Sequence, residues 1–214
     1  MSERIDEVER VAAVWQQLTG WLKENAPTSY ASLLPPAPEE EIHAVEAHLM
    51  QYVGYGLPAE LVALWRLCGG VEHQYIKENE DEGDVGSGAF LPDGVLFAPA
   101  EAIRPRLPRY GERDYWGGAQ VVPWLTRDEA GPEYGQYVSA AGVGHWSTMD
   151  GTVVSEPRYP SMAAYLESVH RTLTVGPADL MGSEVPGIVW GCLVWEDLEC
   201  PVLDDALKHW APIH

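Results

Sequence analysis

Basic residues are scarce in this chain. Thirteen Lys and Arg stand against 33 Asp and Glu, which leaves a formal net charge of −20 over 214 residues. A field of this sign repels phosphate groups, so the composition argues against nucleic acids and anionic membrane surfaces as partners. It attracts cations instead, and a cationic protein is the partner class that the charge favours.

Cysteine is scarce as well. Cys68, Cys192 and Cys200 are odd in number and have no CxxC spacing, which excludes a disulfide framework and a compact zinc knuckle. This usage fits a reducing cytosol. The opening residues SERIDEVERV lack the apolar core of a signal peptide, and the apolar run Val185–Trp195 is too short to cross a bilayer. We therefore expect a cytoplasmic protein with no membrane segment.

Sequence signatures of catalysis are missing too. The chain has no GxSxG, P-loop or HExxH motif, and no GxGxxG between a strand and a helix. His43 and His48 are five positions apart, so they face different sides of a helix and cannot share one metal. We predict a protein without enzymatic activity, metal or cofactor. The alternative is an enzyme whose site is assembled from distant residues such as His73, His145 and Asp150.

Helical periodicity is the clearest pattern that is present. Apolar residues recur at steps of three and four, the spacing of one face of a helix, in several segments. These segments predict helices that begin near Ser2, Pro38, Pro58 and Ser161, each at a residue suited to a helix start. The pair Gly69-Gly70 supplies the stop of the third helix.

Short strands with tight turns are predicted between and after these helices. The expected strands are Val121–Leu125, Tyr134–Ala140, His145–Met149, Thr152–Ser155 and Ile188–Trp195. Asp150-Gly151 predicts a hairpin, and a short helix is expected at 204–209. Helices, then strands, then a helix indicate an α+β domain with a mostly antiparallel sheet. We assign residues 1–175 to this domain and 176–214 to a C-terminal extension packed on it.

Carboxylates are concentrated in the segment 78–84, which we call the acidic loop. Its acidic residues are Glu78, Glu80, Asp81, Glu82 and Asp84. A calcium loop is disfavoured because Ala89 stands where the bidentate glutamate should be. Two interpretations stay open: a solvated loop with no further role, or a surface that steers a basic partner and accepts its Lys and Arg side chains. These acids are candidate partner-binding residues.

The aromatic residues are unevenly distributed among types, with nine Trp and ten Tyr against two Phe. Trp116 lies in the loop Tyr110–Gly118, which has glycine on both sides and no periodic pattern. An exposed aromatic residue on such a loop is typical of an interface anchor. Trp116 is therefore a candidate partner-binding residue, and the alternative is a ring folded back onto the core.

An ordered set of short motifs runs from Trp15 to Leu173. The set comprises LPPAPEEEI at 34–42, LPAEL at 57–61, Gly69-Gly70, LPDG at 91–94, VVPW at 121–124, the Asp150-Gly151 hairpin and Tyr165-Leu166. In this order and spacing, the motifs resemble the SUKH superfamily, which includes yeast cell-wall assembly regulators and many bacterial immunity proteins.

The resemblance implies a compact α+β module with N-terminal helices packed on a mostly antiparallel sheet, a closing helix and no catalysis of its own. In bacteria, the implied role is immunity, in which the protein neutralises a toxin, often a nuclease or deaminase, by noncovalent binding. Enzymes that act on nucleic acid present basic clefts, so an acidic inhibitor suits them and gains association rate. The eukaryotic members suggest the alternative, a regulatory scaffold that binds cellular partners.

Overall fold

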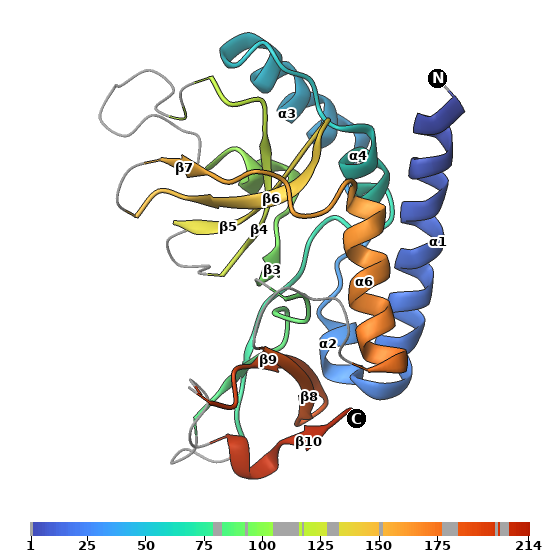
Figure 1. Ribbon diagram of the computed structural model, residues 1–214, viewed down its shortest axis with the longest axis vertical. Helices are drawn as coiled ribbons and strands as arrows, with labels where there is room; N and C mark the ends of the chain where they lie inside the picture. The colour runs from blue at the N-terminus through green and yellow to red at the C-terminus, as the bar shows by residue number, and fades with distance from the viewer. Residues whose placement is uncertain are drawn as a thin grey trace.

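A group of helices, a five-stranded antiparallel sheet and a smaller C-terminal sheet build the fold (Figure 1). This arrangement confirms the α+β class. The structure, a computed structural model, describes residues 2–78, 83–92, 94–104, 116, 118–127, 133–149, 152–176, 184–199, 201 and 206–214, with side chains from residue 6 onward.

The four predicted helices begin at the expected residues, near Ser2, Pro38, Pro58 and Ser161, and the structure adds two short helices. Their bounds are α1 Ser2–Asn25, α2 Pro27–Ala31, α3 Glu39–Tyr52, α4 Ala59–Trp65, α5 Pro99–Ala102 and α6 Met162–Val175. The helices α3 and α4 start directly after Pro38 and Pro58. Ser161 caps α6, because its hydroxyl accepts a hydrogen bond from the Ala164 N–H at 3.1 Å. Pro27 ends α1 and also opens α2, since proline is well suited to a first helical turn.

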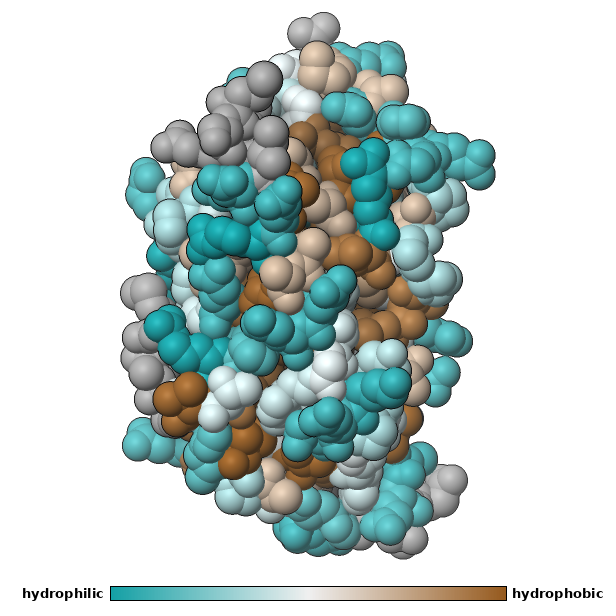
Figure 2. All heavy atoms as spheres, turned by 90° about the vertical axis from the view of Figure 1, so that its right-hand side faces the viewer, coloured by the Kyte–Doolittle hydropathy of each residue, from teal (hydrophilic) through white to brown (hydrophobic). Residues whose placement is uncertain are grey.

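The helices α1 and α6 run side by side along one side of the molecule (Figure 1). Their apolar stripes face inward, with Leu18 and Leu22 of α1 and Leu166 and Val169 of α6 all fully buried. Figure 2 faces this side and shows hydrophilic side chains over much of it, with hydrophobic residues between them. None of the helices in the described part of the chain has the length and apolar character of a membrane span.

The five-stranded sheet is an antiparallel meander in the order β3-β4-β5-β6-β7. Its strands are β3 Val95–Leu96, β4 Val122–Thr126, β5 Tyr134–Ser139, β6 Gly142–Ser147 and β7 Val153–Val154. Asp150 and Gly151 lie outside the described residues. The pairing of Trp146 with Val154 and of Ser147 with Val153 nevertheless confirms the antiparallel hairpin that they predict.

Large aromatic side chains fill the core between the sheet and the helices. Trp65, Trp124 and Tyr165 are at most 1% exposed. The Trp65 indole N–H donates to the Phe97 carbonyl at 3.0 Å, and the Tyr165 hydroxyl donates to the Pro92 carbonyl at 2.8 Å. The rings of Trp124 and Tyr165 pack edge to face with their centroids 5.5 Å apart. The buried polar tips of Trp65 and Tyr165 are thereby satisfied by backbone groups.

The C-terminal segment forms a separate three-stranded sheet in the order β10-β8-β9. Its elements are β8 Val185–Val189, β9 Cys192–Glu196, the 3₁₀ helix η3 Leu207–His209 and β10 Ala211–Pro212. The prediction of one buried strand over Ile188–Trp195 is wrong, because the chain reverses at Trp190 and Gly191. Both residues have positive φ, at 49° and 76°, as a tight hairpin turn requires. The run is apolar on both sides of the turn, which hides the reversal.

This hairpin packs on α2. The Thr28 hydroxyl donates to the Trp190 carbonyl at 2.9 Å, and the Thr28 N–H donates to the Gly191 carbonyl at 3.0 Å. The buried Ser29 hydroxyl accepts from the Leu193 N–H at 3.0 Å, and Leu193 itself belongs to the main core. Segment 184–199 therefore shares its packing with the first helices of the chain.

Candidate functional site

The acidic loop connects two very short strands, β1 Tyr75–Ile76 and β2 Val85–Gly86. These strands pair antiparallel, with Tyr75 opposite Gly86 and Ile76 opposite Val85, and so bring the two ends of the loop together. Glu78 and Asp84, the acids at those ends, are exposed. The candidates Glu80, Asp81 and Glu82 lie outside the described residues.

Trp116 is buried, with 3% of its surface exposed. Its ring packs against Trp146 of β6 with the centroids 5.5 Å apart. The hypothesis of an exposed anchor is therefore wrong, and the alternative of a loop ring folded onto the core holds. Burial of a large apolar ring stabilises the fold. A residue such as Trp116 can therefore lie in the core even though its neighbours in the sequence show no helical or strand periodicity.

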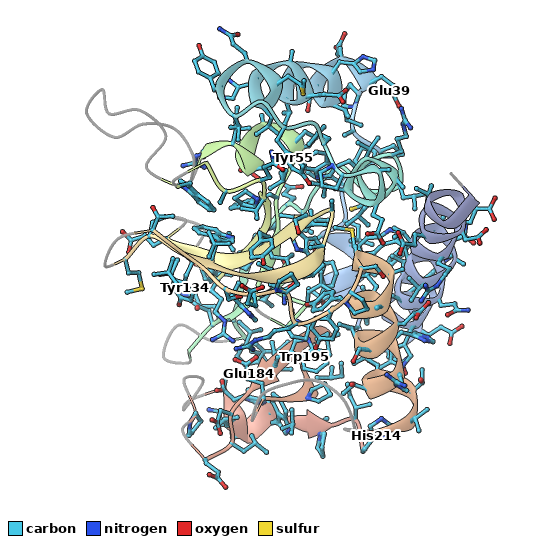
Figure 3. All side chains as sticks on the ribbon, turned by 45° about the horizontal axis from the view of Figure 1, so that its top comes forward. Glu39, Tyr55, Tyr134, Glu184, Trp195 and His214 are labelled. Atoms are coloured by element: carbon cyan, nitrogen blue, oxygen red, sulfur yellow. The ribbon has the colours of Figure 1, made fainter. Side chains whose placement is uncertain are left out.

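A pocket of about 380 Å³ lies beside the acidic loop, and we call it the acidic pocket. Three parts of the chain enclose it: the β1–β2 hairpin, one end of the five-stranded sheet, and the C-terminal hairpin. The residues that line it are His73, Tyr75, Asp84, Gly86, Ala89, Leu91, Gly94, Val95, Arg127, Tyr134, Glu184, Val194, Trp195 and Glu196. Figure 3 labels Tyr134 of the five-stranded sheet, and Glu184 and Trp195 of the C-terminal segment.

Carboxylates dominate the charge of the acidic pocket. Asp84 is exposed, Glu184 is partly buried, and Glu196 is only 5% exposed. The Glu196 Oε1 atom accepts a hydrogen bond from the Asp197 N–H at 3.1 Å, which orients this buried carboxylate. Among the described lining residues, Arg127 is the basic one. Three carboxylates and one guanidinium give these residues a net charge of about −2, with His73 neutral.

Arg127 is already engaged with one of these carboxylates. Its Nη2 atom lies 2.5 Å from the Glu184 Oε1 atom. The two side chains are 39% and 28% exposed, so solvent reaches this ion pair. An ion pair this accessible contributes little to stability, about 0–1 kcal/mol, and water or another ion competes for it.

Aromatic rings form much of the remaining wall. The Trp195 indole N–H donates to the Phe90 carbonyl at 2.9 Å, which fixes the ring relative to the segment before β3. The His73 and Tyr75 rings meet edge to face at 5.1 Å. Burial lowers the pKa of His73, so the imidazole is neutral at neutral pH. Its ring lies so close to Gly86 that a β-carbon there would overlap it.

The alternative catalytic grouping of His73, His145 and Asp150 is not tested as a whole, because one of its three members lies outside the described residues. His73 lines the acidic pocket, whereas His145 lies within β6 and is absent from the pocket lining. Asp150 falls outside the described part of the chain. The described residues also contain no group of three or more His, Cys, Asp or Glu side chains placed to share a metal ion.

The two described cysteines are poor nucleophiles. Both are buried and reduced. Burial raises the pKa of the Cys68 thiol, and it raises the pKa of the Cys192 thiol to about 11. Both thiols are thus protonated at neutral pH, and the thiolate is the reactive form.

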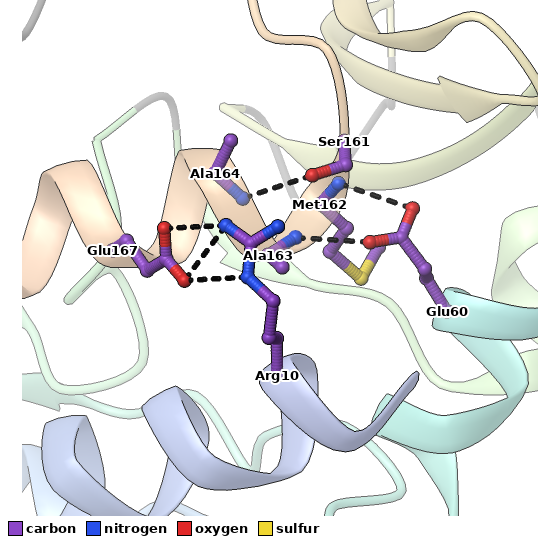
Figure 4. A network of polar contacts seen from close by, with 7 residues as sticks. All are labelled: Arg10, Glu60, Ser161, Met162, Ala163, Ala164 and Glu167. Carbon is purple, nitrogen blue, oxygen red and sulfur yellow. Dashed lines mark hydrogen bonds and ion pairs between the residues drawn. The ribbon is translucent and has the colours of Figure 1, made fainter. Parts of the chain in front are cut away.

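A second pocket, of about 330 Å³, lies near the start of α6 and has Glu60 of α4 in its wall. Glu60 is 9% exposed, and its carboxylate accepts hydrogen bonds from the N–H groups of Met162 at 3.2 Å and Ala163 at 3.1 Å (Figure 4). Beside it, Arg10 of α1 pairs with Glu167 of α6 at 2.7 Å. This network joins three helices, which indicates that its role is structural.

Sequence reasoning identified Asp84 as a partner-binding candidate and missed Arg127, Glu184, Trp195 and Glu196. No motif links Arg127 to the other three, because it lies 57 residues before Glu184 in the chain. Glu184 precedes β8, whereas Trp195 and Glu196 end β9. The nearest signal is Trp195-Glu196, where the apolar run ends in an aromatic residue followed by an acid.

No protein-family model matches the sequence of this chain, and no curated protein matches it.

Proposed function

We propose that this protein is a non-catalytic binding module that captures a cationic protein, with the acidic pocket as the contact for a basic side chain of that partner. The role that fits best is immunity: noncovalent neutralisation of a basic nuclease-type or deaminase-type toxin. The motif pattern of the SUKH superfamily and the net charge of −20 support this role.

The observation that carries the proposal is the composition of the acidic pocket. A concave surface contains an exposed acid, Asp84, and a buried acid, Glu196, in a molecule whose overall charge has the same sign. Long-range attraction would speed encounter with a basic surface, and the pocket would then give the docked partner a defined position. The raised pKa values of the Cys68 and Cys192 thiols agree with a role that involves no nucleophile.

Co-expression with the protein encoded by the adjacent gene tests this proposal. If that protein is toxic and basic, we expect this chain to restore growth, and the purified pair to bind with an affinity that falls steeply between low and high salt. The triple variant Asp84→Asn, Glu184→Gln, Glu196→Gln should lose rescue. The matched control Glu9→Gln, Glu41→Gln neutralises exposed acids on α1 and α3 and should retain it.

Failure to bind a basic neighbour at low salt would contradict the proposal. An affinity independent of salt would contradict it too. A locus whose neighbours encode no toxic protein would favour the regulatory scaffold instead.

A further inference from the structure

We infer that the acidic pocket is a receptor for an arginine side chain of the partner, and that Arg127 is the protein's own guanidinium, which the incoming one replaces on Glu184. This inference rests on the proposed function and specifies the chemistry of the contact. The site is a cavity with aromatic walls and buried charge, built from three separate segments.

The volume of the pocket suits one long side chain. At about 380 Å³, it lies at the small end of the range of about 300–1,000 Å³ in which proteins hold small ligands. A helix or a strand of the partner would not enter a space of this size. A single anchoring side chain would fill it, which is the usual way that one residue comes to dominate an interface.

The charges favour a cation that reaches the buried carboxylate of Glu196. Asp84 is exposed and is therefore accessible to an approaching cation. Glu196 is 5% exposed, so a cation that reaches it is largely removed from water, and the attraction between the two charges is stronger there. Truncating one partner of such a buried pair affects the dissociation rate more than the association rate.

The aromatic rings select guanidinium over ammonium. Tyr75, Tyr134 and Trp195 line the pocket together with its carboxylates. A guanidinium is planar, stacks on aromatic faces and donates two parallel hydrogen bonds to one carboxylate, whereas the ammonium of lysine is a compact, strongly hydrated charge. An environment of rings and carboxylates therefore suits arginine better.

Arg127 demonstrates this chemistry within the molecule. Its guanidinium lies 2.5 Å from Glu184 in the pocket wall, in an ion pair that solvent reaches. Replacement of this weak pair by a better-buried guanidinium exchanges one charge contact for another and leaves no carboxylate unpaired. Arg127 also makes the net charge of the pocket less negative. Its removal should therefore strengthen binding of an external cation.

Titration with single amino-acid amides tests the inference without the biological partner. The probes are N-acetyl-arginine amide, the matching lysine amide, and the citrulline amide, which has the shape of arginine without its charge. The NMR signals of the Trp195 indole N–H and of the pocket backbone report occupancy. We expect arginine amide to shift them, lysine amide to bind about tenfold more weakly, and citrulline amide to leave them unchanged.

Three variants locate the binding. Arg127→Gln should tighten arginine amide binding about fivefold, and Glu196→Gln should weaken it about tenfold. Ala89→Phe fills the pocket without changing charge and should abolish the shifts, while the double variant Glu9→Gln, Glu41→Gln removes distant charge and should leave them unchanged. Thermal unfolding of each variant checks that it is folded. Equal binding of arginine and lysine amides, or full binding in Ala89→Phe, would overturn the inference.

The two proposals can fail separately. If Ala89→Phe still neutralises the adjacent protein, the binding function stands and the arginine pocket is wrong. If arginine amide binds in the pocket but no basic partner is neutralised, the pocket chemistry stands and the immunity role is wrong.

Discussion

Replacement of Glu60 by alanine should weaken the attachment of α6 to the rest of the molecule. The carboxylate accepts the Met162 and Ala163 N–H groups at 3.2 and 3.1 Å, and a hydrogen bond to a charged group contributes about 1.5–3 kcal/mol. Burial of the carboxylate, which is 9% exposed, offsets part of this gain. We therefore expect Glu60→Ala to lower the free energy of unfolding by about 2–4 kcal/mol, measured by urea denaturation with tryptophan fluorescence.

Arg10 provides the matched control. It pairs with Glu167 in the same network (Figure 4), but the two side chains are 48% and 44% exposed. Because exposed ion pairs contribute about 0–1 kcal/mol, Arg10→Gln should lower stability by no more than that. A loss for Glu60→Ala as small as the loss for Arg10→Gln would refute the claim that the Glu60 carboxylate holds the start of α6 through its two hydrogen bonds.

The pH dependence of the Glu60 effect has a definite sign. Burial, the largest cause, raises the pKa of Glu60 above its ordinary value of 4.5, and the charge of Glu7 acts in the same direction, although the two N–H groups oppose them. A raised pKa means that the folded state holds this proton more tightly than the unfolded state does. The corresponding stability is present below pH 4.5 and is lost as pH rises through the raised value.

The comparison of wild type with Glu60→Gln isolates this group, because glutamine does not titrate. The stability of the wild type relative to the variant should decrease as pH rises above 4.5. Chemical denaturation of both proteins from pH 4 upward provides the measurement. A difference that grows with pH would mean that the hydrogen bonds to α6 outweigh burial.

Two further variants test the packing of the sheet. Trp116→Ala removes a buried ring and should lower the free energy of unfolding by about 3–5 kcal/mol, whereas a surface anchor would leave stability nearly unchanged; thermal unfolding distinguishes the two. Gly142→Ala should also lower the free energy of unfolding, by more than about 1 kcal/mol, because φ is 127° and the new β-carbon would overlap the Tyr159 carbonyl oxygen. Urea denaturation measures this loss, and an unchanged midpoint concentration of urea would contradict the geometry.

Local patterns predicted the helices well because their causes are local. Apolar spacing and the start residues Pro38, Pro58 and Ser161 determine where α3, α4 and α6 begin, and each of these causes acts within one turn of helix. The strands β4, β5, β6 and β7 were also predicted, whereas the two-residue strands β1, β2 and β3 were not. Prediction from local sequence patterns failed for the C-terminal hairpin. Its turn at Trp190-Gly191 carries no polar residue, and the reversal depends on backbone angles that the apolar pattern does not reveal.

The candidate site was predicted only in part, because its members meet through the tertiary fold. Asp84 was found from the local density of acids. Arg127 and Glu184 are 57 residues apart, and their contact depends on how the C-terminal hairpin lies against the five-stranded sheet. Trp116 was mispredicted for the same reason. The sequence around it has no periodic pattern, so nothing local indicated that its side chain is buried in the core. A single sequence offers no signal for such long-range pairs.

The hydrogen bond between Thr28 and Trp190 joins positions 162 residues apart. On the ribosome, α1 and α2 emerge long before the hairpin that covers α2 has been synthesised. The same delay applies to Glu184 and Glu196, so residues 78–84 are synthesised well before two of the carboxylates that line the acidic pocket. If the pocket holds a basic side chain as we propose, a product cut short before β9 would keep the acids of this loop but lack Glu196, and it should release a basic protein faster than the full chain does.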